Sequence, residues 1–173
     1  MLMILIPGLI LVGLMIWAST RIKRNAAKAF EREEIETEEF SITKPEGFLS
    51  VVDPPGGLLI SAYSKEFGRE AAGRIRQATI ELRRELGGDV DAIVKRVKAD
   101  STAVASEQIG VVGGHKCANI IVERLEQDVL LESRHKIIAA PDAVYHLVVN
   151  FIPEYKADLE AKLDEALISF SLP

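Results

Sequence analysis

The sequence predicts an α+β protein in which an N-terminal transmembrane helix is followed by one antiparallel β-sheet covered by helices. Three observations predict this fold class. The first 18 residues contain no charged side chain. Four segments between residues 102 and 151 alternate apolar with polar side chains and are separated by short turns, which is typical of an antiparallel meander. Other segments repeat apolar residues every three or four positions, as amphipathic helices do.

Residues 1–20 are expected to form a membrane anchor. The uncharged run Met1–Ala18 has about the minimum length that crosses a hydrocarbon core at roughly 1.5 Å per helical residue. Trp17 suits the level of the lipid headgroups. Nothing basic precedes Leu2, and only Ala18 makes a passable cleavage position. We therefore expect a retained anchor rather than a cleavable signal peptide.

Basic residues follow the anchor directly and include Arg21, Lys23, Arg24 and Lys28. Because Lys and Arg favour the cytoplasmic side, we expect a single-pass protein of the plasma (inner) membrane with a cytoplasmic C-terminal domain. The alternative is the exported, periplasmic side, where the same residues contact anionic headgroups. The predicted membrane-anchoring residues are Trp17, Arg21, Lys23 and Arg24, and the lipid bilayer is the first expected partner.

The rest of the chain divides into a charged stalk, residues 21–39, and one domain, residues 40–173. The stalk changes from basic to acidic and is expected to be partly helical. The formal net charge of -5 lies entirely outside the anchor. An acidic domain is a poor candidate for binding nucleic acid. Cys117 is the only cysteine, which excludes an intrachain disulfide.

The first elements of the domain are separated by turn residues. We expect a strand before Pro45, and a second strand at residues 58–64 after the turn sequence Asp53–Gly57. A helix is predicted over residues 66–86, where Gly87 and Gly88 would end it. Its apolar stripe consists of Ala71, Ile75, Ala78, Leu82 and Leu86.

The second half of the domain reads as a short helix, four strands and a last helix. Asp89 suits the N-cap of the short helix. The strands are "TAVASEQI", "KCANIIVERLE", "RHKIIAA" and "VYHLVVNF", with turns at residues 110–114, 127–128 and 141–142. Pro153 begins the last helix, whose stripe contains Tyr155, Leu159, Leu163 and Leu167. Phe170 and Leu172 are predicted to pack against the sheet.

Four stretches in this order resemble the PsbP-like and DcrB-like (Mog-type) α/β domain family. They are "KPEGF" at 44–48, the long strand at 112–121 after a Gly-Gly turn, "AVYHLVV" at 143–149 and "ISFSL" at 168–172. The resemblance covers nearly everything from Phe40 onward and implies a PsbP-like α/β sandwich. It also implies an exported or membrane-tethered accessory domain that binds larger protein assemblies. It transfers no functional residue, because the matched positions are turn and core positions.

Two histidine-containing pairs are the only candidates for chemistry. His115 and Cys117 share a strand face, as a thiol activated by an imidazole would require, but an isolated cysteine among apolar residues is usually a small buried side chain. His135 and His146 lie on strands joined around Pro141, so pairing would bring them together. With Asp142 or Glu132 they would begin a zinc site, although none of the spacings typical of zinc motifs is present.

The predicted function is therefore a single-pass, membrane-anchored, non-catalytic interaction or accessory domain that supports a membrane-associated protein complex. We expect no catalytic residues, no cofactor and no metal, a protein partner in addition to the bilayer, and no nucleic acid. The alternative is a membrane-tethered domain that binds a small ligand or metal, or a Cys/His hydrolase.

Overall fold

The computed structural model describes residues 28–173, which form a sheet-dominated α+β domain. The predicted anchor and its residues Trp17, Arg21, Lys23 and Arg24 lie outside the described residues. No helix between residues 28 and 173 is long and apolar enough to cross a bilayer.

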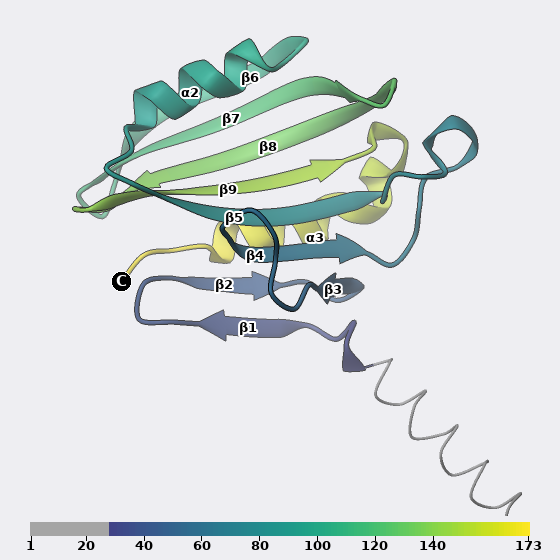
Figure 1. Cartoon of the computed structure of the whole chain (residues 1–173), viewed down its shortest axis with the longest axis horizontal. Coiled ribbons are helices and arrows are strands. Elements are labelled where there is room, and N and C mark those ends of the chain that lie inside the picture. The colour runs from purple at the N-terminus through teal and green to yellow at the C-terminus, as the bar shows by residue number, and fades with distance from the viewer. Residues whose placement is uncertain (1–27) are drawn as a thin grey trace, which may run out of the picture.

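Between residues 28 and 173 the elements follow one another as a series of antiparallel strands interrupted by the helices α2 and α3 (Figure 1). Their bounds are β1 Glu33–Glu36, β2 Ser41–Lys44, β3 Phe48–Ser50, β4 Leu58–Ser64, η1 Glu70–Ala72, β5 Ala78–Leu86, α2 Val90–Ala99, β6 Ala103–Val112, β7 His115–Glu126, β8 Val129–Ala139, β9 Ala143–Phe151, η2 Pro153–Tyr155 and α3 Lys156–Ser169. Strands β1 and β2 pair with each other, and the other seven form one sheet in the order β3-β4-β5-β9-β8-β7-β6.

The predicted meander of four strands is confirmed as β6 to β9. Two of its turns are two-residue hairpins in which both residues have positive φ. These residues are Gly113 (60°) and Gly114 (84°) between β6 and β7, and Gln127 (50°) and Asp128 (65°) between β7 and β8. This geometry matches the right-handed twist of the flanking strands, so the hairpins fix the register of the sheet.

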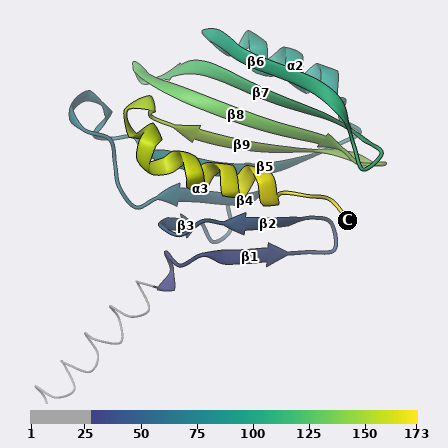
Figure 2. The ribbon, with the colours of Figure 1, turned by 180° about the vertical axis from the view of Figure 1, so that it is seen from behind.

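The two helices pack on opposite faces of the sheet (Figures 1 and 2). Each face of the sheet has its own hydrophobic core. In strand β7, Cys117 belongs to the core that includes α3, whereas its neighbour Ala118 belongs to the core that includes α2. The predicted N-cap of α2 is confirmed, since the Asp89 carboxylate accepts the N–H of Ala92 at 3.1 Å. Phe170 is 1% exposed and packs in the α3 core, as predicted.

The predicted helix at residues 66–86 is wrong. Only the short turn η1 is helical there, and Ala78–Leu86 form strand β5, which pairs with β4 and β9. Ala78 and Leu82 are four residues apart, a spacing that suits one face of a helix and equally one face of a strand. Ile80, also buried, belongs to the strand pattern and lay off the predicted helical stripe.

The expectation of helical structure in the stalk is wrong at Glu33–Glu36, which form strand β1 and pair with β2. The Thr37 hydroxyl closes the hairpin by accepting the backbone N–H groups of Glu39 and Phe40 at 3.2 and 3.0 Å. The buried Lys44 ammonium lies 3.4 Å from the Glu33 carboxylate. The hydrogen bonds of Thr37 and the positive charge of Lys44 therefore offset the repulsion between the glutamates of this strand.

Candidate functional site

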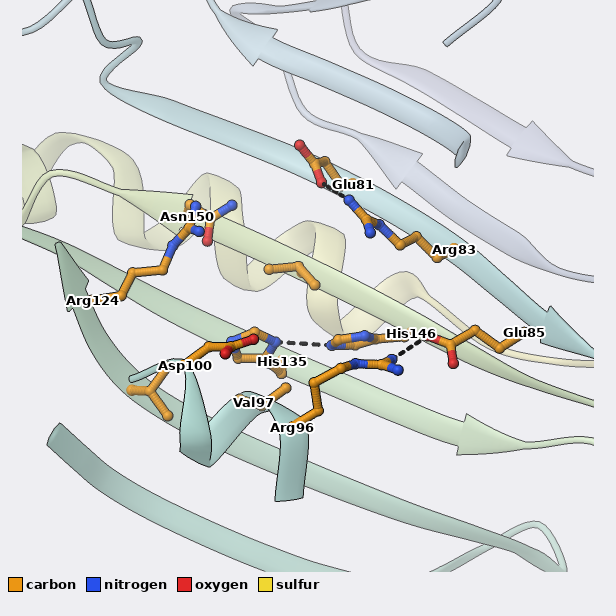
Figure 3. A pocket seen from close by; sticks show the side chains of 12 residues that line it. Glu81, Arg83, Glu85, Arg96, Val97, Asp100, Arg124, His135, His146 and Asn150 are labelled. Atoms are coloured by element: carbon orange, nitrogen blue, oxygen red, sulfur yellow. Dashed lines mark hydrogen bonds and ion pairs between the residues drawn. The ribbon is translucent and has the colours of Figure 1, made fainter. Parts of the chain in front are cut away.

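His135 on β8 and His146 on β9 lie side by side on the α2 face of the sheet, which confirms their predicted proximity (Figure 3). Their rings stack with centroids 5.1 Å apart. Nδ1 of His135 and Nε2 of His146 are 2.9 Å apart and share one hydrogen bond. One ring therefore donates its N–H and the other accepts it.

The carboxylates that were considered as further metal ligands do not join this pair. Glu132 contacts Arg134 at 2.9 Å and Lys156 at 3.3 Å, whereas Asp142 contacts Arg84 at 3.0 Å. Between residues 28 and 173, no group of three or more His, Cys, Asp or Glu residues is placed to hold a metal ion.

A pocket of about 480 Å³ opens beside the histidines, within the range of small-molecule sites. Strands β5, β9, β8 and β7 form its floor, and the C-terminal half of α2 forms one wall. Six charged side chains surround it, three arginines and three carboxylates: Arg83, Arg96, Arg124, Glu81, Glu85 and Asp100. Figure 3 shows how these side chains reach the pocket from separate elements.

Burial keeps both imidazoles neutral. It lowers the pKa of His135 from 6.5 to about 4, with a further contribution from the Arg124 guanidinium. It lowers the pKa of His146 to about 3, with further contributions from His135, Arg96 and Arg83. The neighbouring arginine cations therefore add to the effect of burial on both rings.

The charged side chains are paired at the rim. Arg83 lies 3.3 Å from Glu81, and Arg96 forms an ion pair with Glu85. Arg124 lies 2.8 Å from Glu126, which stands outside the pocket lining. Exposed pairs of this kind contribute only about 0–1 kcal/mol each, so a ligand replaces them at little cost.

The floor itself is held by a buried polar chain. The Ser133 hydroxyl donates to Oδ1 of Asn150 at 2.6 Å, and Nδ2 of Asn150 donates to the Thr79 hydroxyl at 3.1 Å. These bonds join β8, β9 and β5 and fix the Asn150 amide at the end of the pocket.

The other candidate pair, His115 and Cys117, lies on the opposite face. Both residues line an apolar groove of about 760 Å³ between β7, β8 and the segment that follows α3. Cys117 is buried and belongs to the α3 core. No hydrogen bond joins the two side chains in the described structure, so the arrangement does not resemble a thiol activated by an imidazole.

Strand β6 is a second candidate site, because it forms one edge of the sheet and all ten of its residues are exposed. Four of them are large and apolar, with exposed fractions between 43% and 69%: Val104, Ile109, Val111 and Val112. Among the described strands, none pairs with the outer side of β6. Its outward backbone N–H and C=O groups are therefore open to another strand.

Sequence reasoning missed the three pocket arginines and the open edge. Arg83 falls within the predicted helix at residues 66–86, which would separate it from the histidines. The signal that was present is the alternation of buried and exposed residues in Ala78–Leu86, which places Glu81, Arg83 and Glu85 on the same face as His146.

Comparison with known proteins supports the fold. No protein-family model matches this chain, and no curated protein matches it. The solution structure of cyanobacterial PsbP (CyanoP) from Synechocystis sp. PCC 6803 aligns with a TM-score of 0.58 and 10% identity, covering 83% of this chain and 92% of CyanoP. The crystal structure of LpqN from Mycobacterium tuberculosis aligns with a TM-score of 0.57 and 9% identity, covering 82% and 90%. The fold is PsbP-like, as the sequence predicted.

Proposed function

We propose that this chain is a non-enzymatic accessory domain, held at a membrane by its N-terminal segment, that binds a protein partner along edge strand β6. The observation that carries the proposal is the exposure of all ten residues of this strand, which lies at the edge of the sheet. An unpaired edge of that length is a template for strand addition, in which backbone hydrogen bonds give affinity and alternate side chains give specificity.

The chemistry of β6 defines the partner segment. Val104, Ile109 and Val111 pair in register with β7 residues on the α2 side of the sheet, so they form an apolar row beside the helix. Glu107 lies in the same row and binds Lys98 of α2 at 2.7 Å. The complementary partner is an extended protein segment with apolar residues at alternate positions.

An irregularity in the pairing limits where that segment binds. The register with β7 shifts between Val104 and Ser106, and is continuous from Ser106 to Val112. Bulges interrupt strand pairing at sheet edges. The partner strand is therefore expected along Ser106–Val112.

The membrane part of the proposal is supported by the sequence. Residues 1–18 carry no charge and are followed by Arg21, Lys23 and Arg24, which favours the inner membrane with the domain in the cytoplasm. The periplasmic side is the alternative that the resemblance implies. LpqN is described as involved in cell envelope biogenesis. An accessory role in an envelope complex is compatible with either the cytoplasmic or the periplasmic side of the membrane.

Site-specific photocrosslinking tests the partner surface. A photoreactive residue is placed at Val111 of the full chain in its native membranes, with Val52 as the matched control because it is an equally apolar, 88% exposed valine away from β6. We expect a discrete protein adduct from position 111 and none from position 52. Absence of an adduct at 111, or the same adduct at both positions, would contradict the proposal.

A topology experiment tests the membrane side. Reporters that work only in the cytoplasm, or only after export, are fused in turn behind Pro173. Cytoplasmic activity is the expected result. Activity only after export would place the partner on the outer side of the membrane and contradict the assignment from the basic residues at 21–24.

A further inference from the structure

We infer that the pocket beside His135 and His146 is a binding site for a small oxyanion, a carboxylate or a phosphate group. Three guanidinium groups reach it from three different elements, Arg83 from β5, Arg96 from α2 and Arg124 from β7. Figure 3 shows them around the two imidazole rings. Planar guanidinium groups match the geometry of carboxylates and phosphates and bind them through paired hydrogen bonds.

The three arginines of the pocket act on the histidines at its floor. The three arginines and three carboxylates of the lining balance formally. Arg124 contributes to the lowered pKa of His135, and Arg96 and Arg83 contribute to that of His146, so all three arginines act on the floor. Two of these guanidinium groups, Arg83 and Arg96, are held by exposed ion pairs with Glu81 and Glu85, which an anion can replace at little cost.

Two nitrogen atoms of the pocket residues lack hydrogen-bond partners. They are Nε of Arg124 and Nε2 of His135, both buried. An unpaired buried donor costs about 1–3 kcal/mol. In the tautomer in which His146 donates to His135, both atoms carry a hydrogen. An oxyanion that reached these two atoms would supply the missing acceptors.

Binding is coupled to proton uptake by the histidines. The charged groups that face them are Glu81, Arg83 and Glu85 from β5, Arg96 and Asp100 from α2, and Arg124 from β7. An anion seated among them offsets the repulsion between the arginines and an imidazolium ion, which raises the pKa of the histidines. By linkage, the bound state then holds more protons, and affinity for the anion increases as the pH falls.

The test uses the full chain and two probes, succinate for carboxylates and sulfate for tetrahedral oxyanions. Sulfate keeps the same charge between pH 5.5 and 7.5, so a change in its affinity reports on the protein. Chloride at equal ionic strength controls for screening. Binding is followed by NMR through the ring signals of His135 and His146, which line the pocket.

Arg96→Gln is the decisive variant, because Arg96 lines the pocket but is exposed and forms a surface ion pair, so its removal should not disturb the core. Arg74→Gln is the matched control, since it removes the same charge from an exposed arginine outside the pocket. We expect R96Q to weaken binding about tenfold, which corresponds to one charge-assisted contact. R74Q should bind within about twofold of the unaltered chain.

Sulfate is expected to bind at least about threefold more tightly at pH 5.5 than at pH 7.5. The inference is overturned if neither probe moves the histidine signals, or if R96Q binds as tightly as R74Q. It is independent of the proposed partner surface, because a Val111→Lys substitution in β6 should leave anion binding unchanged.

Discussion

The two edges of the seven-stranded sheet differ in length and exposure. At one edge β3 has only three residues, and Phe48 within it is 1% exposed. The backbone N–H of the preceding Gly47 donates to the carbonyl of Phe30 at 2.7 Å, so the chain before β1 crosses this edge. At the other edge β6 has ten residues, all exposed. The hairpin of β1 and β2 lies on the β3 side of the sheet (Figures 1 and 2).

We interpret this difference as a division of roles, in which the β3 edge contributes to the stability of the fold and the β6 edge is available for binding. Proteins generally protect sheet edges with short strands, bulges or covering segments. The β3 edge is protected in this way and contributes to the core, whereas most of β6 is left open. Substitutions should therefore cost most free energy of unfolding at the β3 edge, less near the pocket and α2, and least in β6. The predictions below follow that order.

The largest effect is expected at the closed edge. Phe48→Ala removes a fully buried ring from the core that includes α3 and should lower the free energy of unfolding by about 3–5 kcal/mol. Chemical denaturation of the full chain measures the loss. A loss below about 1 kcal/mol would show that the β3 edge is not part of the cooperative core.

Acid should destabilise the centre of the molecule through the histidine pair. Both have pKa values lowered from 6.5, to about 4 and about 3, so the unfolded chain binds more protons below pH 6.5. Their contribution is complete above pH 6.5 and is lost as the pH falls towards 4. Between pH 7 and 5.5 we expect a loss of about 2 kcal/mol in total.

Denaturation curves of the unaltered chain and of His146→Gln at these two pH values measure that effect. The variant lacks one of the titrating groups, so its stability should depend less on pH over this interval. Equal pH dependence of the two proteins would contradict the assignment of the effect to the histidine pair.

A smaller effect is expected in α2, which covers the sheet near the open edge. Asp89→Ala removes the side-chain acceptor for the N–H of Ala92 and should lower the free energy of unfolding by about 1 kcal/mol. Asp89→Ser retains a capping oxygen and should recover most of the loss. Thermal unfolding of the two variants provides the comparison.

The smallest effect on stability is expected in β6. Ile109→Thr exchanges one exposed β-branched residue for another and should change the free energy of unfolding by less than about 0.5 kcal/mol. The same variant should lose most of the crosslinking from position 111, because it removes the centre of the apolar row. A large loss of stability would show that β6 is part of the core.

The sequence predicted the parts of the fold that depend on local chemistry. The β6 to β9 meander, the Asp89 cap and the helix after Pro153 follow from alternation, capping and turn residues over a few positions. The proximity of His135 and His146 followed from two adjacent strands and a short turn. Strand β5 could not be assigned in this way, because the spacing of its apolar residues fits both a helix and a strand. Only its pairing with β4 and β9 decides between the two.

The missed features depend on contacts between distant segments. Glu33–Glu36 carry too many carboxylates to suggest a strand, and β1 depends on the turn at Thr37 and on Lys44. The pocket requires β5, α2 and β7 to bring one arginine each to the same place. That β6 lies at an unpaired edge follows only from the order of all the strands in the sheet. Its own sequence alternates side chains in the same way as a strand with neighbours on both sides.

The most direct test of the partner surface is hydrogen exchange of β6 in the full chain. The exchange of its backbone amides is compared between native membranes and the same chain purified away from other proteins, with β4 as the internal reference. We predict that the amides of Ser106–Val112 that point away from β7 exchange slowly in membranes and fast after purification, whereas the amides bonded to β7 and those of β4 do not change. Equally fast exchange of the outward-pointing β6 amides in both states would contradict strand addition at this edge.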